Sequence, residues 1–179
     1  EIQFMGFIYP CMDQLVNHAS RLGNRTRGRL SCPMVLRAPF GGGIHAPEHH
    51  SESTEAIFAH MPGLRVVIPS SPSRAYGLLL AAIRDPDPVL FLEPKRIYRL
   101  NKEEVEDNGE DLPLDVCYVL RDGTDLTLVT WGAMVSTNCC GNYVKQATFD
   151  FRGPVTSRAA SVARPTWSRK SATHYSTHC

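Results

Sequence analysis

Apolar residues along the first hundred positions fall into two alternating patterns. Short, largely apolar runs of the kind found in strands buried on both faces occur at 3–7, 33–37, 64–68 and 88–92. Between them, apolar side chains recur at helical spacing over 8–22, 55–60 and 75–84. Ser53 or Thr54 can cap the second of these helices, and Ser71 or Ser73 precedes the third. This order predicts an α/β fold, with a parallel sheet flanked by helices on both faces.

The pattern changes after residue 100. Residues 101–114 are acidic and polar, which predicts an exposed linker. The apolar run 125–131 then ends at Gly132 and predicts the first strand of a second α/β domain. We therefore expect a first domain over 1–100 and the start of a second over 115–135.

Composition changes again at residue 136. The last 44 residues contain no Leu, Ile or Glu, and 12 of them are Ser or Thr. Six basic residues face one acidic residue there, whereas 13 basic and 17 acidic residues make up the charge of the rest. Such a segment has few side chains to bury in a core. We expect 136–179 to be unrelated to the domains before it, either disordered or translated from a shifted reading frame.

Charge and cysteine spacing exclude several classes of protein. A net charge of +1 gives no reason to expect nucleic acid or a membrane as the main partner, and no run of 18 apolar residues is present. The six cysteines contain no C-x-x-C pair, which argues against a zinc ribbon or a redox motif.

The strongest candidate site follows the run at 33–37. Three glycines, Gly41 to Gly43, are followed within ten residues by proton carriers and potential metal ligands, namely His45, Glu48, His49, His50 and Glu52. Open α/β sheets place their sites where a strand ends in such a turn. A zinc site made of His45, His49 and Glu52 is an alternative, although the spacing is not that of H-E-x-x-H. The glycines also lack the spacing of a dinucleotide-binding or P-loop phosphate motif.

A second candidate lies where the helix at 75–84 gives way to the next strand. Asp85 and Asp87 flank Pro86 there. Aspartate commonly ends a helix at such a position, and a cation bound by the freed carbonyls is the alternative.

Several motifs together resemble one protein family. They are Glu1-Ile-Gln-Phe, Tyr9-Pro10 with Asp13-Gln14, Leu36-Arg-x-Pro-x-Gly-Gly-Gly, His50-Ser-x-Ser53, Pro62-Gly-Leu-x-Val-Val-Ile-Pro69, Gly77-Leu-Leu and Pro88-x-x-Phe-Leu-Glu-Pro-Lys95. Residues 1–135 resemble the β subunit of the thiamine-diphosphate-dependent 2-oxo acid dehydrogenase first component, of the pyruvate and branched-chain types. The resemblance implies a partial pyrimidine-binding domain, followed by the start of a transketolase-type C-terminal domain.

The resemblance also implies a reaction and an assembly. Members decarboxylate a small 2-oxo acid on thiamine diphosphate and pass the acyl unit to a lipoyl group of the acyltransferase core. They form α2β2 tetramers in which α holds most of the diphosphate and magnesium. His50 matches a histidine that does acid–base work in acyl transfer, a role that suits imidazole. Potassium would be bound by main-chain carbonyls at positions that match Met34, Ala82, Ile83, Asp85 and Asp87.

The resemblance is incomplete in two places. The glutamate that activates the cofactor would lie upstream of Glu1, and 136–179 has no counterpart in the family. We therefore expect this chain to be inactive alone, with pyruvate as the preferred substrate of the assembly and branched-chain 2-oxo acids as the alternative. A non-catalytic assembly fragment is a further alternative. The expected location is the bacterial cytoplasm or the mitochondrial matrix, with the N-terminal part of the protein missing from this chain.

Overall fold

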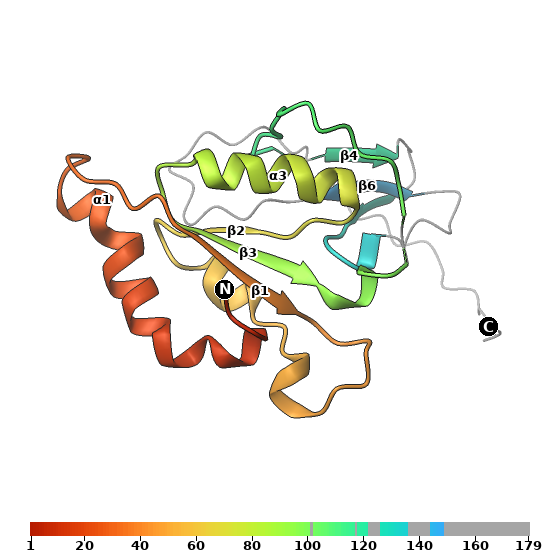
Figure 1. The fold of residues 1–179 in the computed structure, drawn as a ribbon, viewed down its shortest axis with the longest axis horizontal. Helices are drawn as coiled ribbons and strands as arrows, with labels where there is room; N and C mark the ends of the chain where they lie inside the picture. The colour runs from red at the N-terminus through yellow and green to blue at the C-terminus, as the bar shows by residue number, and fades with distance from the viewer. Residues whose placement is uncertain (101, 117, 122–125, 136–143, 149–179) are drawn as a thin grey trace, which may run out of the picture.

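The computed structural model describes residues 1–100, 102–116, 118–121, 126–135 and 144–148. Its first sheet has three parallel strands in the order β1-β3-β2 (Figure 1). The strands are β1 (Val35–Phe40), β2 (Arg65–Val67) and β3 (Val89–Pro94). The register pairs Val35 with Val89 and Phe40 with Pro94, so β1 and β3 end at the same edge of the sheet.

The helices begin and end where the sequence supplies the appropriate residues. Helix α3 (Pro72–Arg84) begins after Ser71, whose side chain accepts a hydrogen bond from the Arg74 backbone N–H, and ends before Asp85 and Pro86. Helix α2 (Glu55–Ala59) has only five residues. Helix α1 (Leu22–Arg25) is the last part of the N-terminal helical segment. No helix of the described part is long and apolar enough to cross a bilayer.

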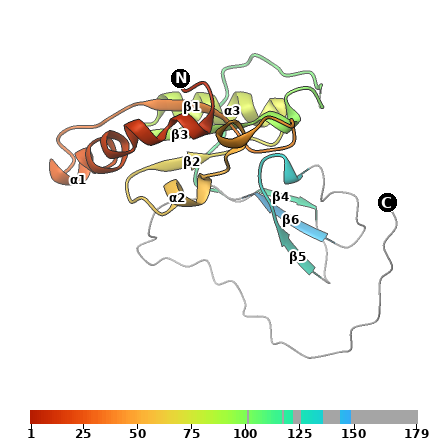
Figure 2. The same ribbon diagram turned by 90° about the horizontal axis from the view of Figure 1, so that it is seen from below.

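The core has two parts because the central strand β3 is buried on both faces. Leu90 and Leu92 of β3 pack in one cluster with Met5, Ile8, Leu15 and Phe58 from the N-terminal segment and α2. Val89 and Phe91 pack in the other with Leu78 and Ala82 of α3. The two views show these layers, with α3 on one side of the sheet and α2 on the other (Figures 1 and 2). The predicted arrangement, a parallel sheet covered on both faces, is confirmed.

The strand predicted at 3–7 is wrong. Phe4 is extended and the Ile2 N–H donates to the Arg37 carbonyl, but Met5–Phe7 then form a 3₁₀ turn. The turn packs so closely against the segment around residue 49 that a Cβ atom on Gly6 would lie 2.2 Å from the His49 carbonyl oxygen. A tertiary contact therefore overrides the local apolar pattern.

The helix predicted at 8–22 is present but irregular. The segment passes through a 3₁₀ turn at Tyr9–Cys11, a π-helical stretch at Gln14–His18 and another 3₁₀ turn at Ala19–Arg21. Its apolar side chains still face the core, with Ile8 and Leu15 buried.

The acidic stretch after residue 101 is exposed over most of its length, but it is tied to α3. Tyr76 donates to Asp107 at 2.6 Å, and Arg84 pairs with Asp111 at 2.7 Å. Leu114 is buried against the α3 side of the core. The prediction of an exposed linker is therefore wrong at its C-terminal end, because apolar contacts fix that end to the helix.

A second sheet has the strand order β4-β6-β5. It contains β4 (Tyr118–Arg121), β5 (Leu126–Val129) and β6 (Val144–Thr148). The strand expected at 125–131 is thus present as β5. Strand β6 lies inside the segment that we expected to be disordered or unrelated, and it pairs antiparallel with β4 and parallel with β5. The pairing contradicts disorder over 144–148, because backbone hydrogen bonds need no large aliphatic side chain. That the segment is unrelated to the domains before it stays a prediction, and the rest of 136–179 lies outside the described residues.

An ion pair at the start of β2 provides a stability test. Arg65, about a fifth exposed, bonds to the buried carboxylate of Asp85. Removing one member of a buried pair leaves the other charge without its partner, which costs about 3 kcal/mol. We predict that Arg65→Met lowers the free energy of unfolding by about that amount in urea denaturation, whereas Arg99→Met on the exposed surface changes it by less than about 0.5 kcal/mol. Equal stabilities of the two variants would contradict a structural role for the pair.

Candidate functional site

The predicted site forms a loop between β1 and α2. The backbone turns at Gly41 and Gly43, whose φ angles of 83° and 92° favour glycine. A 3₁₀ turn at Glu48–Ser51, here called the histidine turn, follows and carries His49 and His50. The Gly41 N–H donates to the Glu52 carbonyl at 2.8 Å, which brings the end of the histidine turn back beside the end of β1.

The His50 ring is half-buried and packs against aromatic side chains of the N-terminal segment. Its centre lies 4.9 Å from the Phe4 ring and 5.6 Å from the Phe7 ring, both edge-on, and 4.5 Å from the His49 ring. Its Nδ1 atom lies 3.3 Å from the Pro47 carbonyl. A carbonyl only accepts hydrogen bonds, so this contact requires a proton on Nδ1 and makes Nε2 the atom that can exchange a proton.

Sequence reasoning missed a lysine below this turn. Lys95 follows β3 directly, is 6% exposed, and its ammonium donates to the His50 carbonyl. The same ammonium lies 4.7 Å from the centre of the Phe4 ring. Burial lowers the pKa of Lys95 from its ordinary value. In the sequence, Lys95 follows a buried strand and ends one of the motifs that carry the family resemblance, and neither signal reveals its partner.

The remaining candidates of the loop do not gather around one point. Glu52 accepts a hydrogen bond from the Tyr9 hydroxyl at 2.6 Å, which raises the pKa of Tyr9, and His49 lies 3.8 Å from Glu48. His45 is exposed with a φ of 57°. In the described part of the chain no three His, Cys, Asp or Glu side chains could hold a metal ion. The zinc alternative is therefore unsupported.

A pocket of about 300 Å³ lies beside the glycine turn. Gly41 to Gly43, Ser53 and Glu55 line it together with Arg96 and Trp131. The Trp131 indole N–H donates to Glu55 Oε1 at 3.2 Å, whereas Glu55 Oε2 is buried without a hydrogen-bond partner among the described residues. The glycine turn and the segment after β5 thus both line this pocket, whereas His50 does not.

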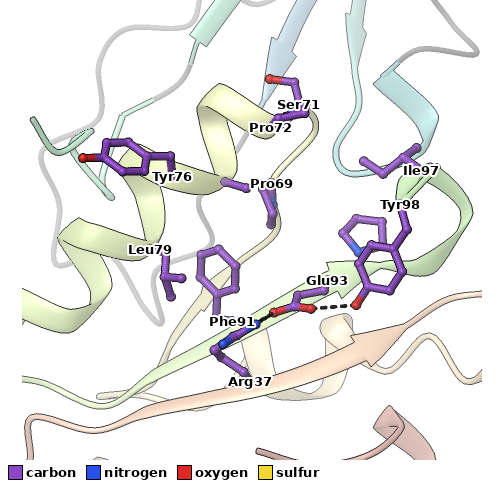
Figure 3. Close-up of a pocket in the computed structure, with 12 residues that line it drawn as sticks. Arg37, Pro69, Ser71, Pro72, Tyr76, Leu79, Phe91, Glu93, Ile97 and Tyr98 are labelled. Carbon is purple, nitrogen blue, oxygen red and sulfur yellow. Dashed lines mark hydrogen bonds and ion pairs between the residues drawn. The ribbon is translucent and has the colours of Figure 1, made fainter. Parts of the chain in front are cut away.

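A second pocket, of about 340 Å³, lies between α3 and the sheet (Figure 3). Its walls are mainly apolar, formed by Pro69, Pro72, Leu79, Phe91 and Ile97. The polar part of its wall is a hydrogen-bonded network of Arg37, Glu93 and Tyr98. Glu93 accepts from Arg37 Nε at 2.8 Å and from the Tyr98 hydroxyl at 2.6 Å (Figure 3). Burial and this hydrogen bond raise the pKa of Tyr98. Sequence reasoning did not identify this network, whose members come from separate strands and turns.

The residues predicted to bind potassium lie at the opposite end of the sheet from the histidine turn. The Met34 carbonyl precedes β1 and accepts from the Val89 N–H at 2.8 Å. The Ala82 carbonyl, at the end of α3, accepts from the Asp85 N–H at 3.4 Å. Arg65 pairs with the buried carboxylate of Asp85 and lies 3.9 Å from the half-exposed carboxylate of Asp87, so one positive charge faces two negative charges.

Comparison with known proteins identifies the domain. A family model described as the transketolase pyrimidine-binding domain matches residues 1–101. The chain belongs to this family. Over 135 residues it is 58% identical to the pyruvate dehydrogenase E1 component subunit beta of Acholeplasma laidlawii and 50% identical to the 2-oxoisovalerate dehydrogenase subunit beta of Bacillus subtilis. These matches cover 75% of this chain and 41% of each relative, so the chain spans less than half the length of these relatives.

A solved structure supports the fold of the pyrimidine-binding domain. A chain titled "Split gene transketolase, inactive beta4 tetramer" matches with a TM-score of 0.50 and 17% identity, covering 82% of this chain and 47% of that one. The predicted fold class and the predicted resemblance to β subunits are both confirmed.

The contact between Gly6 and the histidine turn can be tested within the pyrimidine-binding domain. A Cβ at residue 6 would lie 2.2 Å from the His49 carbonyl oxygen, so Gly6→Ala must displace the turn or the N-terminal segment. We predict a loss of about 1–3 kcal/mol in unfolding free energy, with shifted amide NMR signals at His49 and His50. Gly42→Ala is the control, because a Cβ there would meet nothing within 4 Å. Unmoved histidine signals in Gly6→Ala would contradict the packing.

Proposed function

We propose that this chain forms the pyrimidine-binding part of the β subunit of a pyruvate dehydrogenase first component. The 58% identity to a relative with that name carries the proposal. Branched-chain 2-oxo acids are the second candidate substrates, because a relative named for 2-oxoisovalerate is 50% identical over the same length. The accessible imidazole of His50, at the carboxyl edge of a parallel sheet, supports the acid–base chemistry that both reactions need.

The proposed cofactor is thiamine diphosphate with magnesium, shared with an α subunit. Thiamine diphosphate, when bound, supplies the carbanion chemistry, and the protein supplies orientation and proton transfer. In this proposal the α subunit holds magnesium and the diphosphate, and among the described residues of this chain no cluster of side chains could hold a metal ion.

His50 is the proposed proton carrier of this chain. With Nδ1 directed to the Pro47 carbonyl, the imidazolium form of His50 gives its Nε2 proton to the sulfur that is released when the acyl unit takes the other sulfur and the S–S bond of the lipoyl group breaks. The neutral ring then takes a proton back at Nε2 before the next transfer. Phe7, which contacts this ring, and Tyr9, which is hydrogen-bonded to Glu52, are both more than two-fifths exposed. Such exposed aromatic surface suits a covering partner, for which the α subunit and the lipoyl domain of the acyltransferase are the candidates in an α2β2 assembly.

The proposed location is the cytoplasm of a bacterium or the mitochondrial matrix. It is supported by the relatives, which include bacterial proteins and a subunit of Arabidopsis thaliana whose name specifies mitochondria.

Potassium is a further proposed ligand, bound by the main-chain carbonyls of Met34, Ala82, Ile83, Asp85 and Asp87. The fit is reasonable because a carbonyl oxygen has two lone pairs, and the bonds to the Met34 and Ala82 carbonyls use one of each. Arg65 occupies the buried carboxylate of Asp85, and the net charge of Arg65, Asp85 and Asp87 is negative, which favours a cation at the nearby main-chain oxygens.

We predict that potassium stabilises the chain selectively. At a concentration tenfold above the dissociation constant, KCl would raise the free energy of unfolding by about 1.4 kcal/mol relative to tetramethylammonium chloride. Urea denaturation at matched ionic strength measures this difference. Equal stability in the two salts would remove the proposed site.

The catalytic role of His50 can be measured in a chimera. Residues 1–135 of this chain would replace the matching segment of the A. laidlawii β subunit, co-expressed with its α subunit. We predict that His50→Ala lowers the rate of lipoamide acylation by about 10²–10⁴-fold, the usual contribution of a general acid–base group. His60→Ala, at an exposed histidine after α2, should retain the parent rate.

Two outcomes would count against this function. A parent rate of acylation in His50→Ala would remove His50 from the mechanism. Co-assembly of the parent chimera with α but without turnover of pyruvate or 2-oxoisovalerate would favour a non-catalytic assembly role instead.

A further inference from the structure

We propose that Lys95 is a positioning residue for His50. The inference rests on the proposed function, in which the imidazole of His50 carries a proton. It assigns to the Lys95 ammonium the task of holding both the backbone and the ring of His50 in the conformation that acyl transfer requires.

The geometry of the strands explains why these two residues meet. Phe40 and Pro94 are paired at the ends of β1 and β3, so the chain leaves the sheet at neighbouring points. From β1 it continues into the glycine turn and the histidine turn, and from β3 directly into Lys95. The ammonium thereby reaches the carbonyl of a residue 45 positions earlier in the sequence.

The ammonium contacts His50 in two ways. It donates a hydrogen bond to the His50 carbonyl, which fixes the backbone of the turn. It also lies 4.7 Å from the centre of the Phe4 ring, and that ring contacts the His50 imidazole at a centroid distance of 4.9 Å. Lys95 therefore controls the direction of the carbonyl and, through Phe4, the packing of the ring.

The histidine turn needs such an outside contact. His45 and Glu48 have positive φ angles of 57° and 45°, conformations that residues other than glycine rarely adopt. Local hydrogen bonds hold the ends of the loop, from Ser51 Oγ to the Ala46 carbonyl at 2.6 Å and from the Gly41 N–H to the Glu52 carbonyl at 2.8 Å. Lys95 is the residue that fixes the His50 carbonyl between them.

Burying the ammonium group of Lys95 costs free energy, because the charge loses its contact with water. Burial disfavours the charged form of Lys95, and its pKa is lowered accordingly. An apolar side chain of similar length would pack against Phe4 without that penalty. The presence of a lysine here is explained by its hydrogen bond to the His50 carbonyl, which an apolar side chain cannot donate.

NMR on the complete 179-residue chain tests the positioning directly. In the parent chain we expect nuclear Overhauser contacts between the ring protons of His50 and Phe4. Lys95→Met keeps the length of the side chain and removes the donor, and we expect these contacts to be lost while the other amide signals remain. Lys95→Arg, which can still donate, should retain them, and Lys102→Met at an exposed lysine should leave them unchanged.

Two results would overturn the proposal. One is a folded Lys95→Met chain in which the contacts between His50 and Phe4 persist. If that variant does not fold, the parent chain still decides, because the Lys95 ammonium protons must exchange slowly with water and show contacts to Phe4. Their absence would reject the proposal. This readout needs no cofactor or α subunit, so a failure of the proposed function would show separately, in the His50→Ala chimera.

Discussion

The structure depends on one strand that is buried on both faces. Strand β3 has a parallel neighbour on each side and a hydrophobic cluster on each face, with Leu90 and Leu92 directed into one cluster and Val89 and Phe91 into the other. A strand enclosed in this way cannot slip by one residue, because every side chain would exchange faces. The positions of the residues just before and just after β3 are therefore fixed by the core.

Both candidate sites lie at the ends of this strand. At its start, Asp87 and Asp85 meet Arg65 of β2, and the Met34 carbonyl meets the first residue of β3. At its end, Lys95 meets the loop that follows β1. The polar groups of each site come from segments far apart in the sequence, and the parallel register brings them together. The carboxyl end is also the edge at which open α/β sheets usually bind ligands.

The sequence predicted the elements whose signals are local. The β-branched run 64–68 and the apolar run 88–92 led to the correct strands because neither alternates with polar residues, and Ser71 marked the start of α3. The candidate site between β1 and α2, which includes the histidine turn, was identified because its residues are contiguous in the sequence. The role of His50, the potassium ligands and the domain bounds remain predictions.

What the sequence did not reveal depends on contacts between distant segments. The run 3–7 turns instead of pairing as a strand because Gly6 lies against His49, and nothing within the run indicates that neighbour. Lys95 and the Glu93 network were missed for the same reason. Strand β6 was missed because the prediction for 136–179 rested on side-chain composition, which indicates whether a segment can form a core. A strand within a sheet is held by backbone hydrogen bonds, which composition does not indicate.

These long-range contacts bear on how the histidine turn would meet a partner. A non-glycine residue in the left-handed region costs about 1–3 kcal/mol, so His45 and Glu48 keep their conformations only where surrounding contacts impose them. Those contacts come from Lys95, from the N-terminal turn around Gly6 and from the end of β1, all within this chain. The ordering of the turn is therefore achieved by folding and does not await a partner. A site ordered before association loses less conformational entropy on binding. The half-buried ring of His50 can then meet a partner without a prior rearrangement of its own backbone.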